Sequence, residues 1–364
     1  MFVFVVVNLY LKTWTWTVLV IIIFVQITCA GCGQKSASLQ DFSGEEFIMN
    51  TLVRVHVICE DEQKGRAALK QAFDVFKKID HLTNRFPEGG PTASSPGDVL
   101  KINGSAGLEP VEVSVDTVRI IQRSQYFARL TGGAFDITIG PVMDSWGFGK
   151  DIQYVPTDEE ISRALSLVDY RKVEVDPGKA TVFLPQPGMS LDLGGVAKGY
   201  AMDEAVKALR EAGIQHALIN AGGSVYALGT RPDGEPWRVG IQDPRNSEDI
   251  IAILSLKDSA AVTSGDYQRY FEQEGVYYHH IIDPSTGKQA RDLIQTTVIA
   301  ESTTDADILS TALFVLGPRR GMSFVEELPG TEAVLIGPDK LVSVTAGLIN
   351  QLTFTGDGGY QIAS

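Results

Sequence analysis

The sequence predicts an α+β fold, in which mixed or antiparallel sheets are flanked by helices. Strand-like runs follow one another closely in the second half of the chain, and only a few segments have helical periodicity. This succession favours a sheet with separate helices over a regular alternation of strand and helix. The 36 glycines indicate many tight turns. We expect one domain over residues 45–364.

The N-terminal segment differs from the rest of the chain. Residues 2–28 are nearly all apolar and carry one charge, Lys12. An apolar core followed by small residues is typical of a secretory signal, and Ala30-Gly31 before Cys32 resembles a bacterial lipobox. We therefore expect a lipoprotein-type signal peptide over 1–31, lipidation at Cys32 and a flexible tether over 32–44. An uncleaved signal-anchor helix is the alternative.

Charge and cysteine content exclude two classes of protein. The net charge of −14 argues against duplex nucleic acid as a partner. Lipidation at Cys32 and removal of Cys29 would leave Cys59 as the last of three cysteines, so a disulfide framework is excluded. Cys59 lies in an alternating run and is expected to be a buried thiol.

The first half of the chain is predicted to hold two amphipathic helices. A strand is expected over 47–59, a long loop over 84–110, and the helices over 63–82 and 114–130. The aromatic and glycine-rich segment 133–149 is interpreted as loop. Later come a short helix that starts at a capping box over 157–160 and a hairpin over 173–184.

The second half is predicted to be rich in strands. A helix with a C-terminal glycine at Gly213 follows the Gly194-Gly195 pair. A later helix is expected over 305–316, ended by Gly317-Pro318. The expected strands cover residues 216–220, 224–229, 237–242, 250–256 and 276–282.

The stretch 191–203 is a candidate phosphate site. Its glycine pair lies where extended chain turns into helix, and glycines there let the backbone approach a ligand. The pair lacks the G-x-G-x-x-G spacing of a dinucleotide-binding fold. Lys198 in the first turn suits a phosphate, and Asp192 could bind a hydroxyl, an amino group or a metal. The alternative is a glycine turn with an exposed lysine.

A candidate metal site lies on the last predicted helix. Asp307 and Thr311 are four residues apart and share a face. A carboxylate and a hydroxyl are hard oxygen ligands, which suit Mg²⁺ and not zinc. The alternative is that Thr304 is the N-cap residue and Asp307 its capping partner.

A histidine pair ends a predicted strand. Neighbouring strand residues point to opposite faces, so His279 and His280 are not expected to chelate one metal. One of them is a candidate general base, with an ordinary pKa of ~6.5, or else both are structural. Asp283 is expected to start an Asx-type turn. The G-x-S-x-G and H-E-x-x-H motifs are absent, which leaves serine hydrolases and zinc proteases without support.

Six motifs occur in a characteristic order. They are GAFDITIGP, LDLGGVAKGYAMD, NAGGS, TSGDYQRYF, HHIIDPSTG and the D-x-x-x-T of DILSTALFVLG. Together they resemble the ApbE family of FAD:protein FMN transferases, over about residues 49–317. The resemblance implies an ApbE-like flavin transferase fold. It also implies Mg²⁺-dependent transfer of the FMN moiety of FAD to a Thr or Ser hydroxyl of a protein, with release of AMP.

The resemblance further implies partners and roles. The acceptor would be a flavin-carrying subunit of a membrane redox complex, met on the extracytoplasmic side of the cell membrane, where the lipid anchor holds the protein. His280 would be the base that deprotonates the acceptor hydroxyl. Mg²⁺ would be bound by the side chains of Asp307 and Thr311 and by the carbonyls of Gly195 and Ser310. FAD would contact Met49, Ala134, Phe135, Asp136, Asp192, Lys198 and Ile282.

Two positions depart from the family pattern. Arg85 stands where some members carry an aromatic residue, so stacking on the flavin is not assumed there. Ser310 stands where some members carry a second carboxylate, so a second metal ion lacks side-chain support.

Three alternatives to a transferase remain at this stage. An FAD pyrophosphatase would use the same site with water as acceptor. A non-catalytic lipoprotein would only bind FAD, and a structural lipoprotein would use its glycines only in turns. The presence of Asp307, Thr311 and His280 favours an enzyme. A cation bound by both groups requires that the Asp307 carboxylate lie close to Gly195.

Overall fold

The computed structural model describes residues 38–86 and 96–363. Residues Gln40–Ser364 form one unit that contains both helices and sheets, as the α+β prediction requires. The expected signal peptide and Cys32 lie outside the described residues. The tether was predicted to end at residue 44, which is wrong because strand β1 already begins at Gln40.

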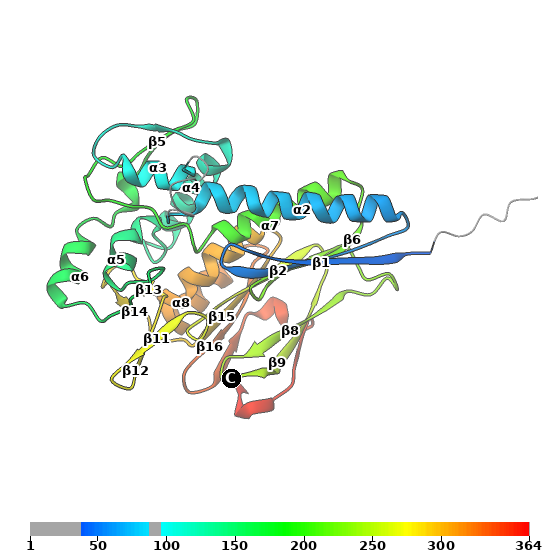
Figure 1. Ribbon diagram of the computed structural model, residues 1–364. Coiled ribbons are helices and arrows are strands. Elements are labelled where there is room, and N and C mark those ends of the chain that lie inside the picture. The colour runs from blue at the N-terminus through cyan, green and yellow to red at the C-terminus, as the bar shows by residue number, and fades with distance from the viewer. Residues whose placement is uncertain (1–37, 87–95, 364) are drawn as a thin grey trace, which may run out of the picture. The chain divides into compact units, whose positions relative to one another are not determined.

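A nine-stranded sheet forms the centre of this unit (Figure 1). Its neighbouring strands are antiparallel except for the last pair, β17 and β19, which is parallel. In spatial order the strands are β1 (Gln40–Ile48), β2 (Thr51–Cys59), β6 (His216–Ala221), β7 (Ser224–Leu228), β10 (Ser259–Gly265), β15 (Gln295–Ala300), β16 (Glu332–Ile336), β17 (Leu341–Val344) and β19 (Gln361–Ile362).

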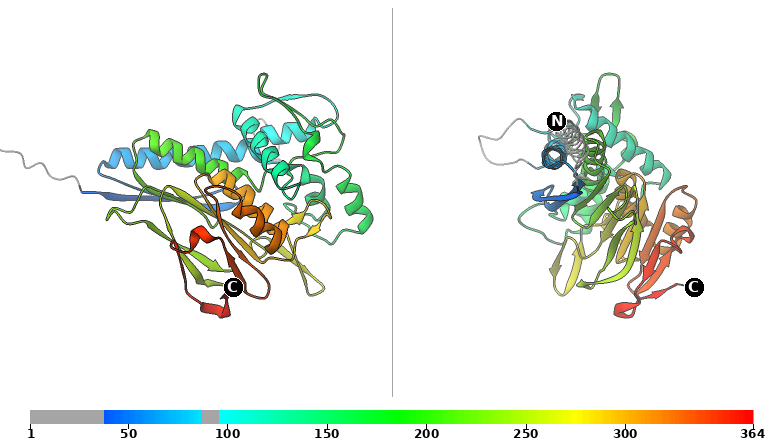
Figure 2. Two further views of the ribbon diagram at one scale, coloured as in Figure 1. Left: turned by 180° about the vertical axis from the view of Figure 1, so that it is seen from behind. Right: turned by 90° about the vertical axis from the view of Figure 1, so that its right-hand side faces the viewer.

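Both faces of the sheet are covered. Helices α2 (Glu62–Thr83), α7 (Ala197–Glu211) and α8 (Thr303–Glu326) lie over one face, and a second sheet, β18-β9-β8, lies on the other (Figures 1 and 2). That second sheet comprises β8 (Trp237–Asp243), β9 (Asn246–Leu256) and β18 (Leu352–Phe354). Val262 and Val298 pack under the helices, whereas Ala261 and Ile299 pack against the second sheet.

Shorter elements gather at one end of the sheet (Figure 1). The helical ones are α3 (Asp98–Gly104), α4 (Val115–Leu130), α5 (Gly140–Ser145) and α6 (Asp158–Leu165), with 3₁₀ turns at Ile137–Ile139 and Tyr170–Lys172. Two further 3₁₀ turns, Ala346–Leu348 and Asp357–Gly359, lie elsewhere, against β16 and β9 respectively. The strands are β3 (Val111–Glu112), β4 (Glu174–Asp176), β5 (Thr181–Phe183), β11 (Tyr270–Gln273), β12 (Val276–His279), β13 (Ile282–Asp283) and β14 (Lys288–Gln289).

Most predicted helices are confirmed, because their local signals agree with their packing. Helices α2 and α4 begin at the side-chain caps of Asp61 and Ser114. The capping box is present between Thr157 and Glu160. The predicted hairpin is β4–β5, and Gly213 adopts φ 72° after α7.

Several predicted boundaries are wrong. The strand expected over 47–59 starts later, as β2 at Thr51, and it forms a hairpin with β1, with Met49 and Asn50 at positive φ in the turn between them. Helix α3 lies inside the segment 84–110 that was expected to be loop. The helix predicted to end at Gly317-Pro318 does leave helical geometry at Gly317, where φ is 75°, but a second helical segment, which was not predicted, follows it to Glu326 within α8. None of the helices in the described ranges is long and apolar enough to cross a membrane.

The close approach of α7 to α8 depends on a glycine, which gives a first prediction. A Cβ at Gly199 would overlap the carbonyl oxygen of Thr303 and lie 2.8 Å from the Cβ of Asp307. We expect Gly199→Ala to lower the free energy of unfolding by about 1–3 kcal/mol, because the helices must separate. Denaturant unfolding measures this change.

A matched control is Gly104→Ala at the end of α3. No atom lies within 4 Å of a Cβ built there. This variant should be neutral or slightly stabilising, since Ala favours helix over Gly. Equal stabilities for the two variants would contradict the role assigned to Gly199.

Candidate active site

A cavity of about 820 Å³ collects residues from distant parts of the chain. Its wall is built by the turn between β1 and β2, the end of α2, the segment around Phe135, the turn at Gly194-Gly195 before α7, and α8. The turn at Gly194-Gly195 is called the glycine turn below. It contains all the residues for which the sequence predicted flavin, base or metal roles except Ser310: Met49, Ala134, Phe135, Asp136, Asp192, Gly195, Lys198, His280, Ile282, Asp307 and Thr311.

The glycine turn and α8 meet at the floor of this cavity. A Cβ at Gly195 would lie 3.4 Å from the Oγ1 atom of Thr311. One turn further along α7, the Gly199 amide donates to Asp307 Oδ2 over 2.9 Å. The expected proximity of Asp307 to Gly195 is therefore confirmed.

Asp307 is a buried carboxylate, and one of its oxygens lies near a positively charged side chain. Its side chain is 5 % exposed, and its Oδ1 lies 3.7 Å from Lys198 Nζ. Helix α8 is capped by Ser302, whose hydroxyl accepts from the Asp305 amide over 3.2 Å. The alternative in which Thr304 and Asp307 cap this helix is therefore wrong.

Hydroxyl groups surround Thr311. Ser264 on β10 lies 2.8 Å from the Ser310 hydroxyl and 3.5 Å from the Thr311 hydroxyl, measured between oxygens. Ser310 is fully buried and donates to the main-chain oxygen of Asp307 over 2.9 Å. Ser264 had been assigned no role, although it lies in TSGDYQRYF, one of the six motifs that carry the family resemblance.

The donor chemistry at this floor fits a hard divalent cation. Asp307, Thr311 and the nearby main chain offer oxygen, and the described part of the chain holds no cluster of three His, Cys, Asp or Glu side chains able to bind a metal. Mg²⁺ commonly takes one or two protein oxygens and completes its shell with phosphates and water. The residues present therefore suit Mg²⁺ together with a phosphate ligand.

His280 is held in one tautomer by the backbone. Its Nδ1 lies 3.2 Å from the carbonyl oxygen of Arg269. A carbonyl can only accept, so Nδ1 carries the proton and Nε2 keeps its lone pair. His279 points to the opposite face, where it is buried against the edge of Phe314. The prediction that the pair does not chelate one metal agrees with this geometry.

The surroundings of His280 keep its ring neutral. Enclosure by protein atoms is the main cause, and the positive charge of Arg269 adds to it, so that the pKa of His280 falls to about 3. Burial likewise lowers the pKa of His279 to about 4. A neutral imidazole with a free Nε2 can accept a proton but cannot donate one from that atom.

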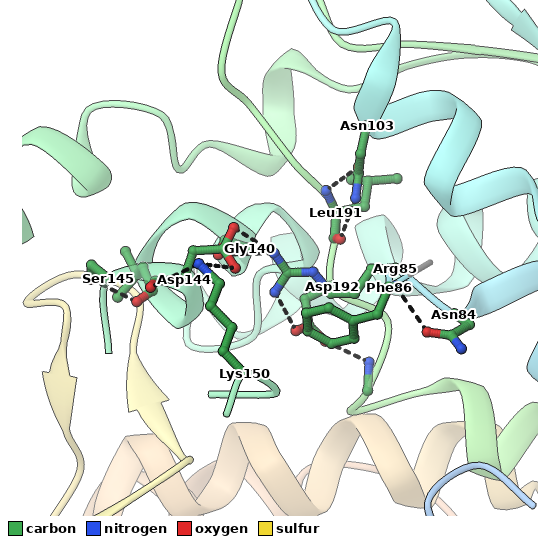
Figure 3. A network of polar contacts seen from close by, with 12 residues as sticks. Asn84, Arg85, Phe86, Asn103, Gly140, Asp144, Ser145, Lys150, Leu191 and Asp192 are labelled. Atoms are coloured by element: carbon green, nitrogen blue, oxygen red, sulfur yellow. Dashed lines mark hydrogen bonds and ion pairs between the residues drawn. The ribbon is translucent and has the colours of Figure 1, made fainter. Parts of the chain in front are cut away.

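Arg85 ties the glycine turn to α5. Figure 3 shows its guanidinium between Asp192 and Asp144, with bonds of 3.0 Å to the Asp192 carboxylate and 2.8 Å to the Asp144 carboxylate. The other Asp192 oxygen accepts from the Gly194 amide over 2.8 Å. Arg85 is 8 % exposed and lies 5.1 Å from the centre of the Phe86 ring. Arg85 thus fixes the orientation of Asp192. The sequence pattern had not suggested this role for Arg85.

The carboxylate of Asp136 is used within the protein. It accepts from the Thr138 amide over 2.8 Å, from the Thr138 hydroxyl over 2.6 Å and from the Tyr170 amide over 3.0 Å. Burial raises the pKa of Asp136 despite these bonds. A flavin contact at this position would therefore come from the main chain, beside the apolar ring of Phe135.

Met49 and Ile282 both line the cavity. The Met49 amide donates to Asp80 Oδ2 over 3.1 Å, and its positive φ sets the turn between β1 and β2. Ile282 is buried at the start of β13, and the following Asp283 accepts from the Ser285 amide over 2.8 Å, as an Asx-type turn requires.

Fold and cavity together define a class: an α+β protein whose cavity brings a lysine, a glycine turn and carboxylate and hydroxyl oxygens together beside a histidine. The sequence model of the ApbE family matches residues 49–335. The chain belongs to the ApbE family.

Named relatives and solved structures agree. The FAD:protein FMN transferase of Treponema pallidum is 34 % identical over 346 residues, or 90 % of this chain and 94 % of the relative. That of Klebsiella pneumoniae is 32 % identical and covers 88 % of this chain and 96 % of its own. The ApbE protein of Thermotoga maritima has a TM-score of 0.76 at 35 % identity, covering 85 % of this chain and 98 % of its own. The flavin transferase ApbE of Vibrio cholerae has a TM-score of 0.76 at 26 % identity, with coverage of 86 % and 100 %.

The state of His280 gives a second prediction. Because its pKa is about 3, its ring should remain neutral between about pH 8 and about pH 5, where a free histidine with a pKa of ~6.5 becomes charged. NMR of the ¹³C-labelled imidazole measures this, with the signal assigned by its loss in His280→Gln. A His280 signal that titrates near pH 6.5 would contradict the prediction.

Proposed function

We propose that this protein transfers the FMN moiety of FAD to a Ser or Thr hydroxyl of another protein, with Mg²⁺, and releases AMP. The observation that carries the proposal is the meeting of Asp307, Gly195 and His280 around one cavity. The names of the relatives, which are FAD:protein FMN transferases, support the same reaction.

The cavity suits FAD as the substrate. Its volume of about 820 Å³ falls within the range of small-molecule sites, roughly 300–1,000 Å³. Phe135 and Ile282 offer apolar surface for the isoalloxazine ring. The Lys198 ammonium and the N-terminal turn of α7 favour the negative charge of the diphosphate.

Mg²⁺ would be held by Oδ1 of Asp307, the Thr311 hydroxyl and main-chain oxygens, for which Gly195 and Ser310 are the candidates. When bound, such an ion neutralises negative charge that develops on the phosphates. Lys198 lies 3.7 Å from the same carboxylate oxygen and can move to a phosphate oxygen when a cation takes its place.

His280 would act as the general base. As Nε2 takes the proton of the acceptor hydroxyl, the hydroxyl oxygen forms a bond to the phosphorus of the FMN phosphate. The bond between that phosphorus and the bridging oxygen breaks, and AMP leaves with the bridging oxygen. A positioned base is worth ~10²–10⁴-fold in rate.

We also propose an extracytoplasmic location with a lipid anchor at Cys32. The proposal rests on the apolar segment, the small residues before Cys32 and the polar tract after it. A flavin-carrying subunit of a membrane redox complex is the acceptor that fits this location.

The role of His280 is tested by a third prediction. His280→Gln should lower FMN transfer by ~10²–10⁴-fold, while FAD binding remains, because only proton removal is lost. The assay mixes the mature protein with FAD, Mg²⁺ and a candidate redox subunit, and measures flavin fluorescence of the subunit in a gel. His56→Gln, on the exposed side of β2, is the matched control and should transfer normally.

The same assay separates the alternatives. AMP and free FMN with an unlabelled subunit would identify an FAD pyrophosphatase. FAD that stays bound and intact with Mg²⁺ would identify a non-catalytic FAD-binding protein. Full transfer by His280→Gln would remove this residue from the mechanism.

The anchor gives a fourth prediction. After export, Cys32→Ser should appear in the soluble fraction, because the residue that carries the lipid is lost. Fractionation and immunoblotting measure the distribution. Cys59→Ser, at a buried thiol, should stay with the membrane as the unmodified protein does. A membrane-bound Cys32→Ser would favour an uncleaved signal anchor.

A further inference from the structure

Helix α7 lacks a side-chain cap of its own. Its N-cap residue is Val196, whose side chain makes no capping bond. The first amides of a helix have no partner within the helix. At the third residue of α7, the Gly199 amide instead donates to Asp307 Oδ2, on the neighbouring helix α8, over 2.9 Å. Asp307 therefore caps α7 from outside.

The reverse contact is made by Asp203, the last residue of the motif that begins at Leu191. The Asp203 carboxylate accepts from the Thr303 amide over 2.7 Å and from the Thr304 amide over 2.9 Å. It also accepts from the hydroxyls of Ser302, over 2.9 Å, and Thr304, over 2.6 Å. A carboxylate at the N-terminus of α8 is also favoured by the helix dipole.

The two carboxylates form a reciprocal pair of caps. Gly199 and Asp203 are four residues apart on α7, and Thr303 and Asp307 are four apart on α8, so each pair shares one helix face. The helices touch between these two contacts, where a Cβ at Gly199 would overlap the Thr303 carbonyl oxygen. Contacts at two levels prevent α8 from rotating or sliding against α7.

In this arrangement the two oxygens of Asp307 make different contacts. Oδ2 already accepts from the Gly199 amide, which leaves Oδ1, 3.7 Å from Lys198 Nζ, as the oxygen better placed to bind a cation in the cavity. The orientation of Oδ1 then depends on the position of α8 relative to the glycine turn. Asp203 lies outside the cavity wall and sets this position.

We propose that Asp203 is a positioning residue, which holds the start of α8 so that Asp307 presents one oxygen to the cation. The part of this proposal that concerns the cation rests on the function proposed above. The supporting geometry does not depend on any ligand: the Asp203 carboxylate accepts four hydrogen bonds from the start of α8, and the Asp307 carboxylate accepts one from the start of α7.

The experiment compares two capping aspartates. Asp203→Ala removes the cap of α8. Asp61→Ala removes the cap of α2, where the Lys64 amide donates to Asp61 Oδ1 over 2.7 Å, and Asp61 does not line the cavity. Loss of such a cap costs about 0.5–2 kcal/mol, so both variants should lose some stability.

Two measurements separate positioning from stability. Binding of Mn²⁺ in the presence of FAD, followed by EPR, should weaken by ~10–100-fold in Asp203→Ala, as for other residues that orient a ligand. Asp61→Ala should bind Mn²⁺ as the unmodified protein does. Hydrogen exchange of the Gly199 amide, followed by NMR without metal or FAD, should be faster in Asp203→Ala alone.

The outcomes are distinct. Unchanged Mn²⁺ affinity and unchanged Gly199 exchange in Asp203→Ala, with only a loss of stability like that of Asp61→Ala, would overturn the proposal. If the unmodified protein binds no Mn²⁺, the metal part of the proposed function fails. Gly199 exchange then decides by itself whether Asp203 positions Asp307: acceleration supports it, and unchanged exchange refutes it.

Discussion

The contact between α7 and α8 at Gly199 is the constraint on which the site depends. Only a glycine lets the helices approach until the Gly199 amide reaches the Asp307 carboxylate. That approach brings the glycine turn before α7 to Thr311, one turn beyond Asp307. A bulkier residue at position 199 would move the glycine turn away from Asp307 and Thr311, the residues proposed to bind the cation. The close packing of α7 against α8 therefore supports the candidate active site as well as the hydrophobic core.

Each candidate functional group is oriented by a second group that does not react. Arg85 fixes Asp192, the Arg269 carbonyl fixes the tautomer of His280, and the Gly199 amide occupies one oxygen of Asp307. Groups held in this way need little rearrangement when charge develops in a reaction. Enclosure in the cavity contributes too, because it keeps the His280 ring neutral and so leaves the Nε2 lone pair unprotonated.

Local signals explain what could be predicted of the fold. Helices with a cap and one apolar face, such as α2 and α4, were found because cap and periodicity lie in the same short segment. Strands β10 and β15 escaped prediction because almost every residue in them is buried. With helices on one face and a second sheet on the other, they lack the alternation that marks a half-exposed strand.

By itself the sequence determined the family, the α+β class and the chemical types at the site, since ordered motifs and residue types are properties of the chain. Tertiary structure decided which groups are free to react. Asp136 had been expected to contact FAD, yet its carboxylate is taken up by Thr138 and Tyr170. Arg85 and Asp203 act on residues more than 90 positions away. No local pattern records such contacts, because only the packing of separate elements creates them.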